Sequence, residues 1–351
     1  MHDDLPGLFS LPLAAISRRG LHHRVAAALA IGLPAALPAA GKKKGKNKQK
    51  KQCKKLGGVL FKGTCCRGGP RACAARCAFP TVQAAIMGAK AGATITVCPG
   101  TYRENISFFQ AARLVGAGEG SGADSSILRG TGAASVVTSF APRVTLEKVR
   151  ITGGAADYGA GVYNSGDMTL TSCTITGNHA RIGGGGLHNG VNTQFPNGGK
   201  LRLSACTVSG NTVGTAEDGG TGGGGIVNVQ GAVTLTNTVV SDNVTGLAVL
   251  PPGPVTPVSV GGGIYNDRGT FTLTGSTIRG NRANLGGGIR NSDGALTLDA
   301  ASRVTGNTAT ESAGGGGIYN DSTVTLATTS NVTGNTPDNC AGDVAVAQCV
   351  G

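Results

Sequence analysis

Residues 261–281, GGGIYNDRGTFTLTGSTIRGN, contain both motifs on which the fold prediction rests. The first motif, Gly-Gly-Gly-(Ile/Leu/Val)-x-Asn, and the second, (Ile/Val)-x-Gly-Asn, each recur six times, with Ala160 and Asp242 replacing a glycine once each. The first motif ends at Asn164, Asn189, Asn228, Asn266, Asn291 and Asn320, and the second at Asn178, Asn211, Asn243, Asn281, Asn307 and Asn335. Six occurrences of a two-part motif predict a repeat protein with stacked coils.

The spacing of the motifs predicts the size of one coil. Successive first-motif asparagines lie 25, 39, 38, 25 and 29 residues apart. One coil therefore needs about 25 residues, which three short strands and their corners would fill. The excess predicts insertions at 190–199, 212–222 and 244–260. We predict an all-β fold, a right-handed single-stranded parallel β-helix over residues 79–340, which suits a chain with 61 glycines and 4% aromatic residues.

Two-residue alternation predicts which side chains face inward. The leucines that recur once per coil should form one inner row: Leu170, Leu203, Leu235, Leu273, Leu298 and Leu326. The second motif supplies an aliphatic row that begins at Ile175 and a row of small residues that begins at Cys173 and Cys206. The first-motif asparagines share the inward parity, so we expect them to stack at a corner and bond to one another and to turn backbone.

The N-terminal part of the chain has a different composition. Residues 1–40 read as an export signal, either twin-arginine, on the order Ser-Arg-Arg-x-Leu at 17–21, or an ordinary secretory signal. Residues 41–55 form a Lys-rich leader that we expect to be disordered. The formal net charge of +13 comes from this end of the chain, because the residues after Cys77 nearly balance in charge.

A Cys-rich segment, 56–78, follows the leader. Clustered cysteines in an exported chain predict disulfides, whereas zinc binding lacks a CxxC pair here. The C-terminal tail, 341–351, should be closed by a bridge between Cys340 and Cys349, and Cys173 and Cys206 should be free thiols. The disulfide candidates are Cys53, Cys65, Cys66, Cys73, Cys77, Cys98, Cys340 and Cys349.

Residues 79–105 connect this segment to the coils. FPTVQAAIMGAK at 79–90 has the apolar spacing of a short helix that could cover the open end of a solenoid. Together with ATITVCPGTYREN at 93–105, it resembles the segment that leads into the first coil of pectin-lyase-like right-handed β-helix proteins. The repeats resemble, more loosely, those of bacterial polymorphic surface adhesins. The first resemblance implies action on acidic polysaccharides, by a calcium-dependent lyase or a hydrolase with paired carboxylates.

The acidic residues do not form such a pair in the sequence. They are scattered singly, and we assign no catalytic residue; hydrolysis needs two carboxylates on either side of one bond. Asp267, Asp293 and Asp321 follow ladder asparagines closely, so a shallow Ca²⁺ site there is the one cofactor considered. No other cofactor or metal is expected.

A binding surface is the preferred functional hypothesis. The residue before each first-motif asparagine should face solvent, and an outward row of aromatic residues suits flat sugar rings. This outer row is Tyr163, His188, Val227, Tyr265, Arg290 and Tyr319. We expect a monomeric, exported bacterial protein at the cell surface or outside the cell, without a transmembrane segment in the mature chain. It would recognise a polysaccharide or envelope polymer; the leader would contact anionic surfaces, without specific binding of nucleic acid. The alternative is a polysaccharide lyase or glycoside hydrolase.

Overall fold

The computed structural model describes residues 59–61, 64–66, 79, 81–190, 198–214, 222–246, 259–328 and 331–349. The predicted export signal, the leader and most of the Cys-rich segment lie outside these ranges, as do most of the predicted insertions. The described residues all belong to one compact unit, Lys46–Gly351. Before the coils, β1 (Val59–Phe61) and β2 (Thr64–Cys66) pair as an antiparallel hairpin.

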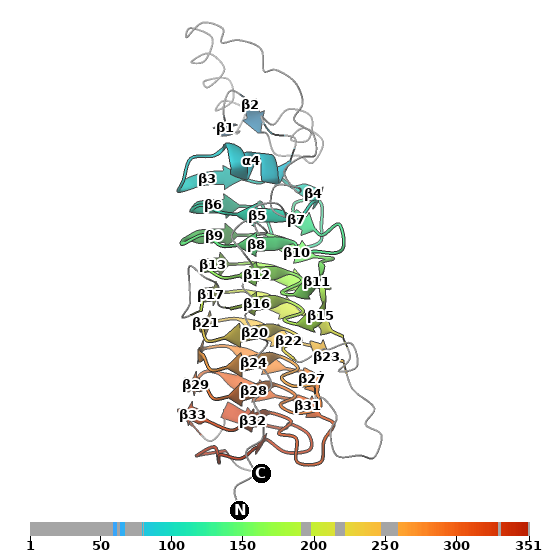
Figure 1. Cartoon of the computed structure of the whole chain (residues 1–351), viewed down its shortest axis with the longest axis vertical. Coiled ribbons are helices and arrows are strands. Elements are labelled where there is room, and N and C mark those ends of the chain that lie inside the picture. Colours follow the sequence, from blue (N-terminus) through green and yellow to red (C-terminus); the bar gives the residue numbers. More distant parts are fainter. Residues whose placement is uncertain are drawn as a thin grey trace, which may run out of the picture. The chain divides into compact units, whose positions relative to one another are not determined.

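The coils form a parallel β-helix of four sheets, which confirms the predicted fold class (Figure 1). The strands of each sheet come from successive coils and pair in parallel, as in the register Leu235↔Leu273↔Leu298. Sheet 1 contains β5 (Ile106–Phe108), β8 (Val137–Ser139), β12 (Val162–Asn164), β16 (Leu187–Asn189), β20 (Ile226–Val229), β24 (Ile264–Asp267), β28 (Ile289–Ser292), β32 (Ile318–Asn320) and β35 (Cys340–Ala341). Sheet 2 contains β3 (Ala93–Thr96), β6 (Ala112–Val115), β9 (Val144–Glu147), β13 (Asp167–Thr171), β17 (Lys200–Ser204), β21 (Ala232–Thr236), β25 (Thr270–Thr274), β29 (Ala295–Leu298) and β33 (Thr323–Leu326).

Two further sheets complete the architecture: sheet 3 has nine strands, like sheets 1 and 2, and sheet 4 has six. Sheet 3 contains β4 (Gly100–Arg103), β7 (Ser126–Arg129), β10 (Arg150–Thr152), β14 (Thr174–Thr176), β18 (Thr207–Ser209), β22 (Val239–Ser241), β26 (Thr277–Arg279), β30 (Arg303–Thr305) and β34 (Val332–Thr333). Sheet 4 contains β11 (Ala155–Tyr158), β15 (His179–Gly183), β19 (Thr212–Val213), β23 (Val244–Thr245), β27 (Arg282–Ala283) and β31 (Thr308–Ala309).

The expectation of three strands in each coil is wrong for the six coils that contribute a fourth strand to sheet 4. The predicted insertions at 212–222 and 244–260 begin inside β19 and β23, so their first residues belong to the coil. After every second-motif asparagine except Asn335, which is followed by the exposed Pro337, the second residue points inward and is small enough for this narrow corner. These buried residues are Ala180, Val213, Thr245, Ala283 and Ala309.

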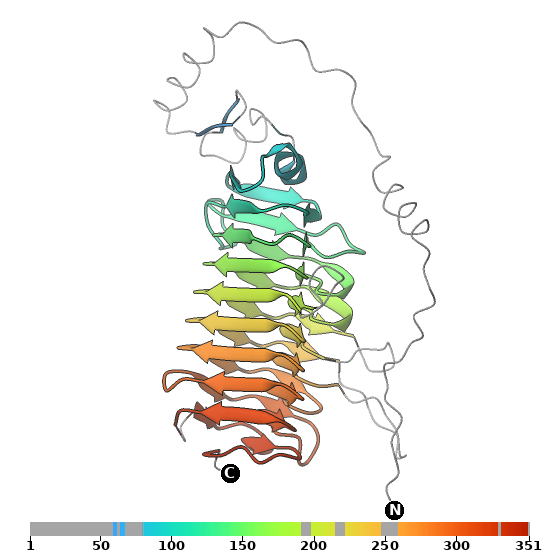
Figure 2. The ribbon, with the colours of Figure 1, turned by 60° about the vertical axis from the view of Figure 1, so that its left-hand side comes forward.

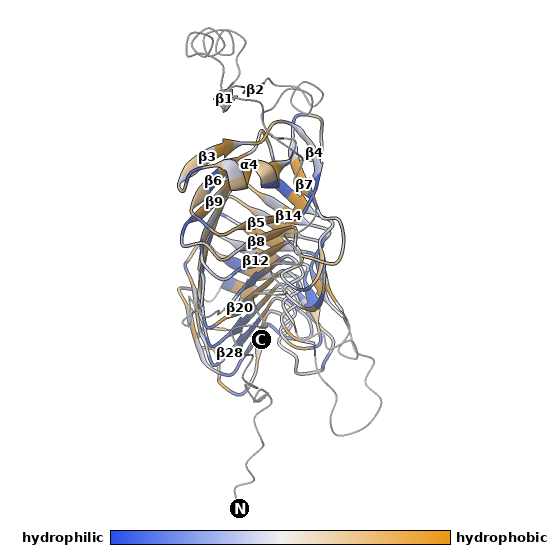
Figure 3. Ribbon diagram, turned by 45° about the horizontal axis from the view of Figure 1, so that its top comes forward, coloured by the Kyte–Doolittle hydropathy of each residue, from blue (hydrophilic) through white to orange (hydrophobic). Residues whose placement is uncertain are grey.

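The inner rows form a continuous apolar core. The six inner-row leucines are between 0% and 6% exposed, and the aliphatic row from Ile175 to Val332 is fully buried. Hydropathy colouring shows hydrophobic and hydrophilic residues alternating within the coils (Figure 3). Because each of these leucines except the last, Leu326, lies between two others in register, the core is a stack of similar contacts rather than a single cluster of large side chains.

The row of small residues accepts hydrogen bonds at a corner. The backbone N–H of Cys173 donates to Cys206 Sγ (3.4 Å), and that of Cys206 donates to Thr238 Oγ1 (3.3 Å). Ser276 and Ser302 continue the column with N–H to Oγ distances of 3.1 Å. A hydroxyl or thiol is needed here because the chain turns sharply and leaves an inward N–H without a partner in the sheet.

A helix covers the first coil, as predicted. α4 (Val82–Gly88) buries Val82, Ala85 and Ile86 and lies against β5 (Figures 1 and 2). Its first turn is capped twice: Thr81 Oγ1 accepts from the N–H of Ala84 (3.0 Å), and the Glu104 carboxylate accepts from those of Val82 (2.8 Å) and Gln83 (2.9 Å). Bonds of this kind satisfy the free N–H groups of a helix start.

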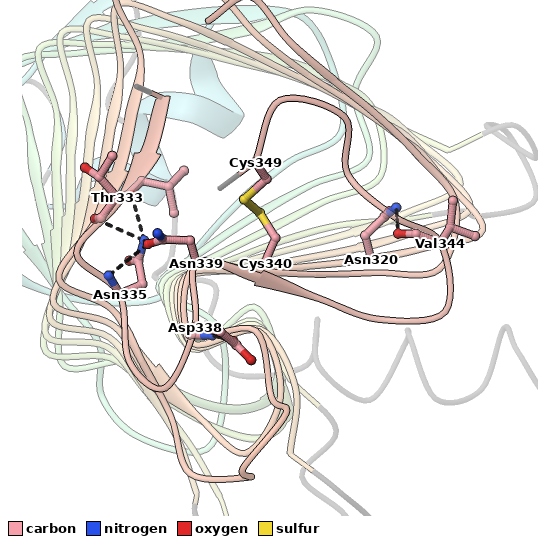
Figure 4. Close-up of a disulfide and its surroundings, with 10 residues drawn as sticks. Asn320, Thr333, Asn335, Asp338, Asn339, Cys340, Val344 and Cys349 are labelled. Carbon is pink, nitrogen blue, oxygen red and sulfur yellow. Dashed lines mark hydrogen bonds between the residues drawn. A yellow bond between two sulfur atoms is a disulfide. The ribbon is translucent and has the colours of Figure 1, made fainter. Parts of the chain in front are cut away.

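The C-terminal tail turns across the last coil. Cys340 in β35 is bridged to Cys349, which confirms that predicted disulfide (Figure 4). The carbonyl of Val344 accepts a hydrogen bond from Asn320 Nδ2 (3.0 Å), the last member of the first asparagine ladder. Val346 and Cys349 also pack against the core. The tail therefore gives the final coil partners that a further coil would otherwise supply.

Candidate functional site

The first-motif asparagines form a buried ladder beneath the outer row. All six are 0% exposed, and each Nδ2 donates to Oδ1 of the next at 2.8–2.9 Å, from Asn164 to Asn320. Several also donate to a carbonyl of the following turn, as Asn266 Nδ2 does to Gly269 (3.0 Å). The ladder closes the corner between sheets 1 and 2 and is out of reach of a ligand.

The asparagines of the second motif form another ladder, which was not predicted from the sequence. Asn178 Nδ2 donates to Asn211 Oδ1 (2.9 Å), and the series continues to Asn335 at 2.9–3.0 Å. The N–H of each asparagine also donates to the same oxygen, as that of Asn211 does to Asn243 (3.0 Å). The recurrence of this asparagine in an invariant place was the signal that could have identified it.

Above the first ladder, the outer face of sheet 1 carries a continuous column of rings. Phe109 stacks on Phe140 (5.9 Å between centroids), Phe140 lies 6.1 Å from Tyr163, and Tyr163 stacks on His188 (5.2 Å). Tyr158, at the end of β11, adds a fifth ring 5.3 Å from His188. Phe109 is 72% exposed. The two phenylalanines were not predicted as part of this surface, because the first coils lack the glycine motif that fixes the alignment.

The expectation that His188 and Val227 face solvent is wrong. His188 is 9% exposed and Val227 is 4% exposed. In-register stacking places His188 directly between Tyr163 and Val227, and the Tyr158 ring and Gly190 lie close to it. Burial lowers the pKa of His188 to about 4, and its Nδ1 has no hydrogen-bond partner among the residues that the structure describes. His188 is therefore a neutral packing residue of the column.

This burial predicts a pH-dependent stability. Because the folded pKa of His188 is about 4, below its ordinary value of about 6.5, the unfolded chain binds the proton more readily. The contribution of neutral His188 to the free energy of unfolding is complete above about pH 6.5 and is lost as the pH falls towards 4. Between pH 7 and 5 we expect this residue to account for a loss of about 2 kcal/mol.

Equilibrium denaturation of the native chain and of His188→Phe at both pH values measures this loss. Phenylalanine keeps a ring in the stack and cannot be protonated, so the variant should lack this part of the pH dependence. Equal pH dependence in the two proteins would show that His188 is not held neutral.

The other end of the outer row combines rings with charges. The Arg290 guanidinium lies 4.4 Å from the centre of the Tyr319 ring and forms an ion pair with Asp321. Burial, followed by the Asp267 charge, raises the pKa of Tyr265 to about 12. Tyr265, Arg290 and Tyr319 are consecutive in register, half-buried, and project from β24, β28 and β32.

Two of the three predicted Ca²⁺ ligands, Asp267 and Asp321, form ion pairs with arginines. Asp267 pairs with Arg268 (3.0 Å). The Asp321 carboxylate also accepts from Ser292 Oγ (3.5 Å) and from the N–H of Asp293 (3.2 Å). In the part of the chain that the structure describes, no group of three or more His, Cys, Asp or Glu side chains could hold a metal ion.

Two other surface aspartates contact arginines of the next coil. Asp157 pairs with Arg181 (2.8 Å) and Asp167 with Arg202 (2.6 Å). The hydrogen bond from Arg181 holds the pKa of Asp157 below its ordinary value. A carboxylate held ionised in this way is a poor proton donor to a leaving group.

The cysteines fall into bonded and free groups. Cys173 and Cys206 are free, buried thiols, as predicted. The contact with Cys206 and burial raise the pKa of the Cys173 thiol well above its ordinary value, so it is a poor nucleophile. Cys98 is disulfide-bonded. The predicted bridges of Cys53, Cys65, Cys66, Cys73 and Cys77 involve side chains outside the described ones.

The ranges that the structure describes contain no helix that is long and apolar enough to cross a bilayer. No protein family model matches the chain, and no curated protein matches it in sequence.

Proposed function

We propose that this chain is an exported recognition module that binds a polysaccharide along the outer face of sheet 1. One observation carries the proposal: the outward aromatic residues of the described coils are gathered on sheet 1 and at its corners with sheets 2 and 4. They are Phe109, Phe140, Tyr158, Tyr163, Tyr265 and Tyr319. Rings beside hydrogen-bonding groups are the usual composition of a sugar-binding surface.

The stacking decides how such a surface would contact a sugar. Tyr163 and His188 cover each other's faces, and Arg290 covers one face of Tyr319. A ligand that lies along the coil axis would meet ring edges, tyrosine hydroxyls and charged groups. Phe109, at the exposed end of the column, is the residue best placed to present a ring face. We therefore propose a shallow, extended contact over several coils.

The rest of the proposal concerns location and partners. The signal pattern in residues 1–40 supports export from a bacterial cell, and the Lys-rich leader supports attachment to anionic envelope polymers. The resemblance of residues 79–105 to pectin-lyase-like proteins supports a polysaccharide as the ligand. We propose a pectin-lyase-like scaffold that acts by binding.

The test is a glycan array screen followed by titration of the bound glycan against two variants. Tyr265→Ala and Tyr319→Ala should each weaken binding by about 1–2 kcal/mol, the scale of a lost aromatic contact at an interface. Thr272→Ala, an outward substitution on sheet 2, is the matched control and should leave affinity unchanged.

Two outcomes would contradict the proposal. Unchanged affinity in both tyrosine variants would remove sheet 1 as the binding face. Unsaturated or newly reducing sugar ends that grow with protein concentration, and that are lost on substitution of a surface aspartate, would instead favour the lyase or hydrolase alternative.

A further inference from the structure

Sheet 3 differs from the other sheets in its charge. Its strands contain five arginines and no aspartate or glutamate: Arg103, Arg129, Arg150, Arg279 and Arg303. Strands of sheet 2, by comparison, place Arg113 beside Glu147 (2.7 Å) and Arg202 beside Asp167 (2.6 Å). The positive charge of sheet 3 is therefore not balanced within the sheet.

Three of these arginines lie together on the first coils. Arg103 and Arg129 are directly in register on β4 and β7, so their Cα atoms are about 4.8 Å apart. Arg150 on β10 is a diagonal neighbour, because it pairs with Ile127, two residues before Arg129. Like charges directly opposite each other on adjacent strands destabilise a sheet. A bound anion would relieve this repulsion.

None of the three guanidinium groups has a hydrogen bond or ion pair to another described residue. The nearest acid in sequence, Glu104, is turned away, because both of its oxygens accept N–H groups of α4. Arg103 and Arg129 are exposed and Arg150 is half-exposed. In-register Thr152 places a hydroxyl beside Arg129. The three arginines are thus available donors next to a hydroxyl.

We infer that Arg103, Arg129 and Arg150 bind the sulfate or phosphate ester groups of an anionic polysaccharide. A tetrahedral ester presents three oxygens and can bridge two guanidinium groups on neighbouring coils, whereas a carboxylate has two oxygens and suits one guanidinium fork. The strands of sheet 3 carry no outward aromatic residue on which bases would stack, so a sugar polymer is favoured over single-stranded nucleic acid. This inference rests on the proposed function, since it names the charge of the polymer.

The experiment uses the full chain with the leader lysines in 42–51 replaced by glutamine, so that the leader does not dominate binding. Affinity for dextran sulfate, a phosphorylated dextran, polygalacturonate, neutral dextran and single-stranded DNA is measured at about 50 mM salt. The triple variant Arg103→Gln/Arg129→Gln/Arg150→Gln should bind at least one ester-bearing polymer about tenfold more weakly or worse. The corresponding lysine triple keeps the charge but loses the fork, and should recover only part of the affinity.

The matched control removes the same charge elsewhere. Arg143→Gln/Lys200→Gln/Arg282→Gln replaces three exposed cations near or in sheets 2 and 4 and should change affinity less than about twofold. Equal losses in the two triples, or full recovery by lysine, would overturn the inference. Preference for polygalacturonate or for DNA over both ester-bearing dextrans would do so as well. The ratio of the two ester-bearing dextrans assigns sulfate or phosphate.

The result separates this inference from the proposed function. If neutral dextran or an array glycan binds through Tyr265 and Tyr319 while ester groups add nothing, the recognition role stands and the sheet 3 site fails. If the ester-bearing polymers bind through sheet 3 while both tyrosine variants bind normally, the sheet 3 site stands and the sheet 1 proposal fails.

Discussion

Asn266→Asp is expected to lower the free energy of unfolding by about 3–5 kcal/mol at pH 7, the scale of a buried charge without a partner. Asn266 is 0% exposed, donates from Nδ2 to Asn291 Oδ1 (2.8 Å), and accepts from Asn228 Nδ2 (2.8 Å). The substitution is nearly isosteric, so it leaves no cavity. The substitution replaces the Nδ2 donor of Asn266 by a carboxylate oxygen, which faces the acceptor Oδ1 of Asn291. It also brings a negative charge into the ladder.

The pH dependence of this variant distinguishes charge from shape. Burial should raise the folded pKa of the new carboxyl above its unfolded value of about 3.9. The variant is then relatively most stable below that value and loses stability as the pH rises through the folded pKa. Chemical denaturation at pH 4 and 7 should show the smaller deficit at pH 4. Asn237→Asp, at an exposed turn residue with φ of 47°, is the control. A deficit below about 1 kcal/mol at pH 7 would mean that the ladder does not depend on its amide donors.

The repeated rows were predictable because a coil samples the same positions many times. Two-residue alternation shows which residues of 270–274 face inward, and the same alternation recurs at the equivalent positions of six coils. The fourth sheet was missed for the opposite reason. β19, β23, β27 and β31 contain two residues each, too few for an alternation to be read. Only the comparison of Ala180, Val213 and Ala283 across coils contains the signal.

The candidate site was partly predictable. Register alone places Tyr265, Arg290 and Tyr319 in one outward column. Outward direction does not decide exposure, however, because the cover over His188 comes from the neighbouring coil and from Tyr158 at another corner. The charge on sheet 3 was also not predicted, because Arg103 and Arg129 lie in coils without the glycine motif and come next to each other and to Arg150 only through strand pairing.

Leu273→Ala is expected to lower the free energy of unfolding by about 3–5 kcal/mol, near the upper part of the range for buried leucines. Leu273 is 0% exposed and lies in register between Leu235 and Leu298. Hydrogen bonds of sheet 2 fix the spacing of the coils on both sides, so the neighbours cannot close the cavity without breaking the ladder of strands.

Two further substitutions show whether the stability lost in Leu273→Ala comes from the stacking of leucines on successive coils. Thr272→Ala changes the neighbouring outward residue and should alter stability by less than about 0.5 kcal/mol, as most surface substitutions do. Leu326→Ala removes the last leucine of the row, on the edge strand β33, where only Leu298 lies alongside in register. Truncation of a leucine with one such neighbour leaves a smaller enclosed cavity. Leu326→Ala should therefore lower the free energy of unfolding clearly less than Leu273→Ala does in the same denaturation experiment. Equal losses at the two positions would mean that the cavity between coils does not set the energy, and that each leucine contributes only its own transfer from water.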